Sequence, residues 1–418
     1  MTGRQGAALV ALLAALAAAC DPSGDLAGAV DTSVAAAGAV TSTAAPLAEP
    51  PQVDRLVVVD DDGLVASIDR NGDDRVVLSE ERELPFQPVW SPDSTRIAYA
   101  SRAANPSFVV VDAVSGESTG VATESASFYF FWSPQGDRLG SLRNGPSGIV
   151  FEVVTAGDKL VIDEVDTGQP FYFSWSPAGD RVVAHVGADR LDVLSPPDDG
   201  LGPEALALAP GAFRAPQWVQ AGVVGVLQRA GGQRLAVVAA DGSETAVVTV
   251  EGGVGFAVSP DGERVAVISF LEVDGTSVSA MLQSVPTLPR NRLYVVDLAT
   301  GEATAVTEEP ALAFFWSPDG TKLLVMGLSD APQEVQLTVW EEGETTPGPS
   351  FRPEVSWVDE FLPFFDQYAQ SMRLWAPDSS AYAFVGRIGD ESGVWVAPAD
   401  GGAPLLVSDG SWVSWSPS

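Results

Sequence analysis

The 418-residue chain holds 22 basic and 56 acidic residues, which gives a formal net charge of -34 at pH 7. An acidic excess of this size repels phosphate backbones, so it argues against nucleic-acid binding and against attraction to an anionic membrane surface. Because 46% of the residues are hydrophobic, the chain can bury a large core within one domain.

The amino terminus has the pattern of an export signal. Arg4 precedes an uninterrupted apolar stretch at residues 7–19, and the only cysteine of the chain, Cys20, follows it directly. The stretch suits a signal-peptide core but is shorter than the roughly 20 residues of a membrane-spanning helix. This pattern resembles a bacterial lipoprotein signal, so we predict a signal peptide at residues 1–19 and lipid attachment to Cys20. A plain secretory signal with an incidental cysteine is the alternative.

Residues 20–52 consist mainly of Ala, Gly, Ser, Thr and Pro with a few acids. Such a composition buries too little apolar surface to offset the entropy of ordering. We predict a flexible tether here and one folded domain over residues 53–418.

A segment near the start of this domain has the spacing of a calcium-binding loop. Asp69, Asn71, Asp73 and Glu80 stand at positions 1, 3, 5 and 12 of an EF-hand loop. However, Asp74 replaces the required Gly, and the flanking residues read as strands instead of helices. Asn-Gly between strands is a strong hairpin signal. We therefore predict a hairpin, with a calcium site as the alternative.

The phrase Trp-Ser-Pro-Asp-Gly, or a near copy of it, recurs with a period of roughly 40 residues. Complete or nearly complete copies start at Trp90, Trp132, Trp175, Trp316, Trp375 and Trp415, and two worn copies start at Trp218 and Val258. Pro, Asp and Gly in this order suit a tight turn between two strands. The repeated Trp residues are expected to wedge between neighbouring sheets.

Each period also contains short β-branched runs, such as residues 96–99 and 108–112, separated by Gly-containing turns. With the apolar residues before the Trp, each period holds four strands, which describes the blades of a β-propeller. The predicted fold class is therefore all-β, a propeller of four-stranded antiparallel blades. We predict eight blades, or seven if one worn copy is not a blade.

The two ends of the domain complement each other. The last copy follows a single strand at residues 412–415, whereas three strand-like runs precede the first copy. Joining them would complete a blade from both termini and close the ring, leaving no free sheet edge.

These repeats resemble the TolB-type propeller repeats, a WD-repeat-like group with a Pro-x-Trp-Ser-Pro-Asp-Gly signature, which Gln87-Pro88-Val89-Trp90-Ser91-Pro92-Asp93 nearly matches. The resemblance implies the fold over residues 53–418 and implies no particular activity.

Catalytic signals are weak. The only histidine, His185, lies in a predicted strand at residues 181–186, where a structural role is expected. One histidine and one cysteine argue against histidine-based triads and His/Cys metal clusters.

Two adjacent periods are longer than the others, through insertions at residues 271–290 and 357–371. In an up-and-down blade both connections emerge on the same face, so we expect them side by side. The second insertion is rich in aromatic residues, namely Trp357, Phe361, Phe364, Phe365 and Tyr368. Aromatic clusters are enriched at interfaces, which favours a partner-binding rim. The alternative is that the rings pack against the blades or plug the channel.

Together these features predict a monomeric, lipid-anchored extracytoplasmic propeller that binds a protein or small ligand without catalysis or cofactor. The alternative is a hydrolase or lyase that uses channel carboxylates, with calcium as a conceivable cofactor.

Overall fold

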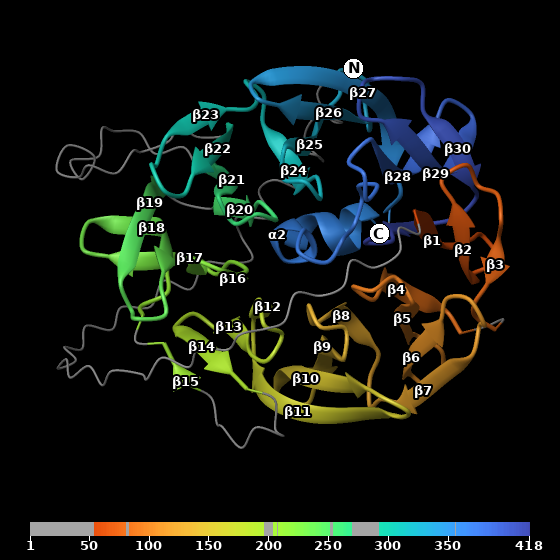
Figure 1. The fold of residues 1–418 in the computed structure, drawn as a ribbon, viewed down its shortest axis with the longest axis horizontal. Helices are drawn as coiled ribbons and strands as arrows, with labels where there is room; N and C mark the ends of the chain where they lie inside the picture. Colours follow the sequence, from red (N-terminus) through yellow and green to blue (C-terminus); the bar gives the residue numbers. More distant parts are fainter. Residues whose placement is uncertain are drawn as a thin grey trace.

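The computed structural model describes residues 54–80, 83–195, 204–206, 208–250, 254–269, 292–355 and 357–418. Most of these residues belong to β-strands, whose antiparallel sheets stand around a common axis (Figure 1). The predicted signal peptide, Cys20, the tether and the insertion at residues 271–290 lie outside the described residues. None of the described helices is long and apolar enough to cross a membrane.

Six of the described sheets have four strands each, and a seventh sheet has seven. The four-stranded sheets are β3 (Val76–Val77), β2 (Val65–Asp69), β1 (Arg55–Val59) and β31 (Trp412–Trp415); β4 (Pro85–Trp90), β5 (Arg96–Ser101), β6 (Ser107–Asp112) and β7 (Ser118–Ala122); β8 (Ser127–Trp132), β9 (Arg138–Gly145), β10 (Gly148–Ala156) and β11 (Leu160–Gly168); β12 (Phe171–Trp175), β13 (Val182–Val186), β14 (Arg190–Leu194) and β15 (Glu204–Ala205); β16 (Gln217–Val219), β17 (Gly222–Arg229), β18 (Gly232–Val238) and β19 (Glu244–Val250); and β20 (Val254–Val258), β21 (Arg264–Ser269), β22 (Leu293–Asp297) and β23 (Ala303–Ala305). The seven-stranded sheet consists of β24 (Ala311–Trp316), β25 (Lys322–Leu328), β26 (Val335–Glu341), β27 (Glu344–Pro353), β28 (Ala381–Ile388), β29 (Glu391–Pro398) and β30 (Leu405–Ser408).

The blade shared by the two termini is confirmed. Strand β31 pairs antiparallel with β1, with Ser414 opposite Val57 and Trp412 opposite Val59. The order β3-β2-β1-β31 thus combines three strands from the start of the domain with one from its end. This pairing closes the ring.

The seven-stranded sheet joins two repeats of the sequence. Strand β27 pairs along its length with β26, but it meets β28 only at its last two residues, Arg352 and Pro353. The Trp375 copy contributes an isolated bridge to Tyr382 instead of a full inner strand. The four-stranded propeller architecture is confirmed, whereas the count of eight blades stays a prediction because these strands form one continuous sheet.

The repeated phrase forms the predicted tight turns. In the first copy, the Ser91 hydroxyl accepts a hydrogen bond from the Arg96 backbone N–H (3.0 Å) and donates one to Asp93 (2.6 Å). The last position of the turn needs a positive φ, which is +69° at Gly320 and +58° at Ser94. Glycine adopts this conformation without strain, which explains its recurrence there.

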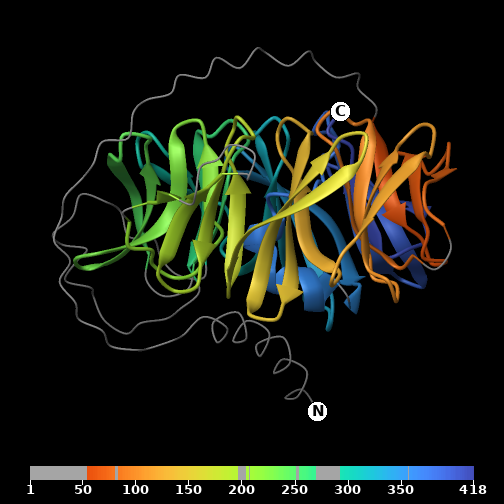
Figure 2. The same cartoon turned by 90° about the horizontal axis from the view of Figure 1, so that it is seen from below.

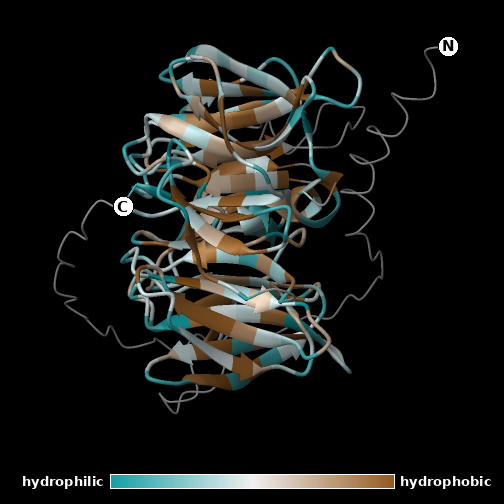
Figure 3. Ribbon diagram, turned by 90° about the vertical axis from the view of Figure 1, so that its right-hand side faces the viewer, coloured by the Kyte–Doolittle hydropathy of each residue, from teal (hydrophilic) through white to brown (hydrophobic). Residues whose placement is uncertain are grey.

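The repeated Trp residues lie between neighbouring sheets, as expected. The indole N–H of Trp132 donates to the carbonyl of Val89 (3.3 Å), and that of Trp375 donates to Phe315 (3.0 Å). Each bond crosses to the preceding blade. Figure 3 shows apolar strands joined by hydrophilic loops, so the core lies within and between the blades.

Candidate functional site in the central channel

The second insertion folds into the centre of the ring. It forms a π-helical turn, η3 (Trp357–Phe361), a 3-10 turn, η4 (Leu362–Phe364), and the single-turn helix α2 (Phe365–Tyr368). Figure 1 shows α2 on the axis, and Figure 2 shows this segment towards the edge opposite the carboxyl terminus. We call residues 357–371 the plug, because they close this end of the channel.

Aromatic contacts join the plug to strands from several blades. Phe361 stacks on Phe86 of β4, with ring centroids 5.6 Å apart, and lies 4.9 Å from Trp412 of β31. Tyr368 meets Tyr129 of β8 edge to face, with centroids 4.9 Å apart. Such pairs add stability beyond the burial of apolar surface. The plug is therefore packed into the core.

Polar groups of the plug also have partners. The Gln367 side chain accepts from the N–H of Phe173 (3.0 Å) and donates to its carbonyl (2.9 Å), as a neighbouring strand would. The hydroxyl of Tyr129 donates to the Gln367 carbonyl (3.0 Å), and that of Tyr368 donates to the Phe128 carbonyl (2.6 Å). Buried polar groups that are paired in this way fix one arrangement.

This packing bears on the five residues predicted to bind a partner. Trp357, Phe361, Phe365 and Tyr368 are buried, and only Phe364 is exposed, at 44%. Four of the rings therefore pack against the blades and plug the channel, which is the alternative considered from the sequence. The rule that aromatic clusters mark interfaces overlooked the apolar channel, which offered these rings a closer surface to cover. Partner binding at this rim stays a prediction.

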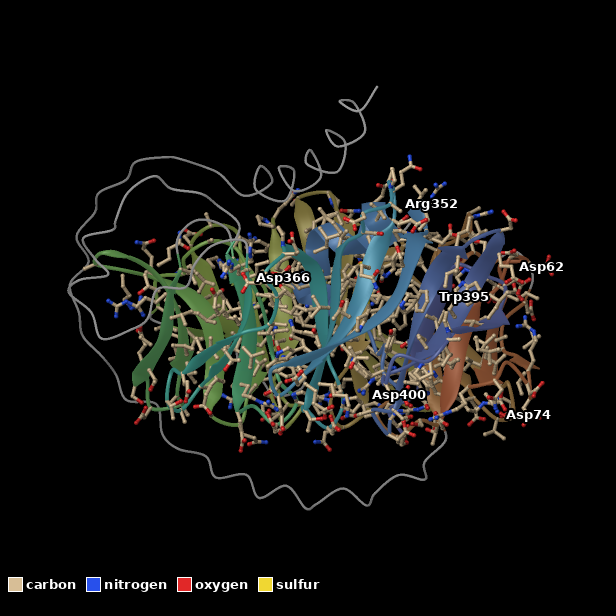
Figure 4. All side chains as sticks on the ribbon, turned by 90° about the horizontal axis from the view of Figure 1, so that it is seen from above. Asp62, Asp74, Arg352, Asp366, Trp395 and Asp400 are labelled. Atoms are coloured by element: carbon tan, nitrogen blue, oxygen red, sulfur yellow. The ribbon has the colours of Figure 1, made fainter. Side chains whose placement is uncertain are left out.

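A buried charge network lies beside the plug. Asp366 is 5% exposed and accepts a hydrogen bond from the Ala215 N–H (3.2 Å). Burial raises the pKa of the Asp366 carboxyl, and the nearby charge of Arg214 opposes that shift. Figure 4 shows Asp366 towards the same edge of the ring as Arg352, away from Asp74 and Asp400.

His185 belongs to this network through the backbone. We assign its Nδ1 as the donor to the Arg214 carbonyl, 3.1 Å away. Its Nε2 is buried and has no hydrogen-bond partner among the residues that the structure describes. Burial lowers the pKa of His185 to about 4, so the ring is neutral near pH 7. A buried neutral imidazole on strand β13 is consistent with the expected structural role.

The candidate calcium loop is a hairpin, as first predicted. Strands β2 and β3 pair through Ala66 and Val77, and the Asp69 carboxylate accepts from the N–H groups of Asn71 (2.9 Å) and Asp73 (2.8 Å). Glu80 lies exposed beyond β3. Over the described ranges, no group of three or more His, Cys, Asp or Glu side chains is placed to hold a metal ion.

The opposite end of the channel contains an open cavity of about 380 Å³. We call it the turn-end cavity, because two turns of the repeated phrase line it. Its lining residues are Val89, Trp90, Pro92, Phe131, Trp132, Pro134, Ser174, Trp175, Gln370, Ser371 and Arg373. This size lies within the usual range for small-ligand sites.

Arg373 is the only charged residue among the described lining of this cavity. Its side chain is exposed to the cavity, and it makes no side-chain hydrogen bond or ion pair with any described residue. The surrounding channel walls desolvate the guanidinium and lower its pKa. Even so, an arginine keeps its charge near neutral pH.

We did not single out Arg373 from the sequence, although a signal existed. It stands two residues before the Trp of its copy, where the other copies carry only apolar residues. These are Pro88, Phe130, Phe173, Pro216, Phe256, Phe314 and Val413. Aligning the copies would have shown one charged residue at an otherwise apolar position.

No protein-family model and no curated protein matches the chain. Among solved structures, it is similar to dihydro-heme d1 dehydrogenase NirN in complex with DHE, with TM-score 0.57 and 15% identity over 89% of this chain and 77% of that one. It is also similar to an oligogalacturonate lyase in complex with manganese, with TM-score 0.52 and 15% identity over 84% and 98%.

TolB from Acinetobacter baumannii also matches, with TM-score 0.40 and 13% identity over 70% of this chain. The chain spans 63% of that TolB chain. At such identities a similarity establishes the fold alone. The repeats and the closed ring of antiparallel sheets give the chain a β-propeller fold, and the two solved structures with TM-scores above 0.5 are similar to it in fold.

Proposed function

We propose that the protein is a non-catalytic binding module, tethered outside the cytoplasm by a lipid on Cys20, and that its ligand enters the turn-end cavity. One observation carries the choice of site. The channel is closed at one end by a plug whose Gln367 amide and Tyr368 hydroxyl are paired, and it is open at the other, where the Arg373 side chain has no partner in the part of the chain that the structure describes. An apolar pocket with a few polar groups is the usual form of a ligand site.

The lining of the cavity favours binding over catalysis. Its described residues include no Asp, Glu or His, the groups that commonly transfer protons in hydrolases and lyases. The buried carboxylate of the channel, Asp366, belongs to the plug and accepts a backbone hydrogen bond. The enzymatic alternative would therefore have to use Asp366 or residues at another place.

A ligand screen on the purified protein tests this proposal. Each compound that raises Tm is recovered and analysed by mass spectrometry, and its binding is repeated with Gln370→Trp and Gln370→Ala. Gln370 is half-buried and lines the cavity, so the larger side chain should block binding while the smaller one preserves it. A ligand recovered unchanged supports a binding role. A ligand converted to product, with conversion lost in Asp366→Asn, would support the enzymatic alternative.

The tether is tested separately. Mass spectrometry of the mature amino terminus should find a lipid-modified Cys20, and Cys20→Ser should release the protein from membranes. An unmodified Cys20 at the mature terminus would exclude the lipid anchor and leave the cavity proposal unaffected.

A further inference from the structure

The geometry points to a more specific ligand: we infer that the turn-end cavity binds an organic monocarboxylate with a planar apolar body, whose carboxylate pairs with Arg373. This inference rests on the proposed function, because it takes the same cavity as the binding site.

The state of Arg373 differs from that of two arginines whose side chains have partners, Arg143 and Arg96. Arg143 is buried and paired with Glu152 (2.5 Å) and Glu124 (3.3 Å). Arg96 lies 4.9 Å from the ring centre of Trp132 and donates to the Ala156 carbonyl (3.2 Å). The Arg373 side chain has no such partner among the described residues, although acidic residues outnumber basic ones by 56 to 22. Because Arg373 is exposed to the cavity and is the only charge in its described lining, a bound anion would form an ion pair there without displacing another described partner.

The charge of the site favours a carboxylate over a phosphate. A guanidinium fork matches the two oxygens of a carboxylate in a bidentate pair. Arg373 supplies one positive charge, and the described lining contains no second basic residue. A phosphate group carrying two charges would keep one of them uncompensated inside a protein of net charge -34. One carboxylate balances the site.

The walls of the cavity favour an apolar, planar body next to the carboxylate. Trp90, Phe131, Trp132 and Trp175 line it. The indole N–H groups of Trp132 and Trp175 already donate to the carbonyls of Val89 and Phe131, each at 3.3 Å. The three indole rings are at most 6% exposed, so among the described lining the half-buried ring of Phe131 is the aromatic surface that a planar apolar group would contact.

Titration calorimetry on the folded protein tests the inference, with benzoate, cinnamate and indole-3-acetate as probes and their neutral amides as controls. At least one carboxylate should bind the wild type roughly tenfold or more tightly than its amide, because a desolvated charge pair supplies that difference. Arg373→Gln should lower the affinity for the carboxylate by a similar factor and leave the affinity for the amide unchanged. Arg373→Lys should fall between them, since it keeps the charge but loses the fork.

Arg352→Gln is the matched control. Arg352 is exposed at the opposite edge of the ring, and its loss changes the net charge equally (Figure 4). This variant should bind the carboxylate like the wild type. The Tm of Arg373→Gln should equal or exceed that of the wild type, since the variant loses an unpaired charge. A lower Tm would indicate a structural role for Arg373 and contradict the inference.

Three results would overturn the inference, and they separate it from the proposed function. If acid and amide bind with equal affinity, and Arg373→Gln changes neither, then Arg373 does not recognise a carboxylate. The cavity would still be a binding site. If phenyl phosphate binds more tightly than any carboxylate, the anion that the cavity recognises would be a phosphate instead of a carboxylate. No binding of any probe up to about 10 mM would count against the cavity itself, and so against the proposed function.

Discussion

The two ends of the channel differ although one stretch of chain, residues 357–373, contributes to both. At the plugged end, rings from this stretch are buried against β4, β8 and β31, and Gln367 is paired with strand β12. At the turn end, the Arg373 side chain faces an open cavity and has no hydrogen-bond or ion-pair partner within the described ranges. Paired, buried groups stabilise a fold, whereas a charge that is exposed to a cavity and unpaired among the described residues adds no such stability and is accessible to a ligand. The described contacts thus stabilise the plugged end, and the proposed ligand site lies at the turn end.

The largest expected effect tests the plug itself. Phe361→Ala should lower the free energy of unfolding by about 3–5 kcal/mol, because it removes a buried ring that contacts Phe86, Tyr368 and Trp412. Phe364→Ala is the control in the same segment, and it should change that free energy by less than about 0.5 kcal/mol because this ring is exposed. Urea unfolding measures both. Equal losses in the two variants would contradict the described packing.

The next effect is the acid sensitivity of the plugged end. The pKa of His185 is about 4 in the folded protein against 6.5 for an exposed histidine, so the unfolded chain binds its proton first as the pH falls. The contribution of His185 to folding stability should therefore be fully present above pH 6.5 and should decline by about 3 kcal/mol between pH 6.5 and 4.

His185→Gln removes this titration, so its unfolding free energy should decline less over the same interval. Urea unfolding of both proteins at pH 7 and pH 4 measures the difference. Parallel pH profiles would show that His185 is not the group responsible.

A smaller effect concerns the amide that replaces a strand pairing. Gln367→Ala leaves the N–H and carbonyl of Phe173 without their partner, which should cost about 2 kcal/mol. Gln370→Ala is the matched control, since Gln370 is half-buried and makes a single long contact of 3.5 Å to Pro216. Thermal unfolding should give Gln367→Ala a clearly lower Tm than Gln370→Ala. The reverse order would mean that the stabilising contact lies at the turn end.

The smallest effect has the opposite sign. Burial raises the pKa of Asp366, so the folded state prefers the protonated acid and loses stability as the pH rises above 3.8 towards the raised pKa. Asp366→Asn mimics the neutral acid and keeps an acceptor for the Ala215 N–H. Its Tm should exceed that of the wild type at neutral pH, and the gain should vanish below pH 3.8. A lower Tm at neutral pH would show that attraction to Arg214 outweighs burial.

Much of the fold could be predicted from the sequence because the determining interactions are local or periodic. The turn at Ser91 needs only its own Ser, Pro and Asp and a residue that accepts positive φ. Missing strands at one terminus and spare strands at the other predicted the pairing of β1 with β31. The hairpin at Asn71 followed from its Asn-Gly pair in the same way.

The sequence by itself determined the ring of four-stranded blades, its closure and the wedging Trp residues, since alternation, turn chemistry and repetition all act at short range. The tertiary structure alone decided where the second insertion goes and what it leaves open. The contacts that decide this, such as Tyr129 with Gln367 and Phe86 with Phe361, join residues more than two hundred positions apart. No local pattern encodes those contacts, so the sequence predicted an exposed rim where the rings are buried. The position of Arg373 at a cavity likewise depends on strands that only the tertiary structure brings together.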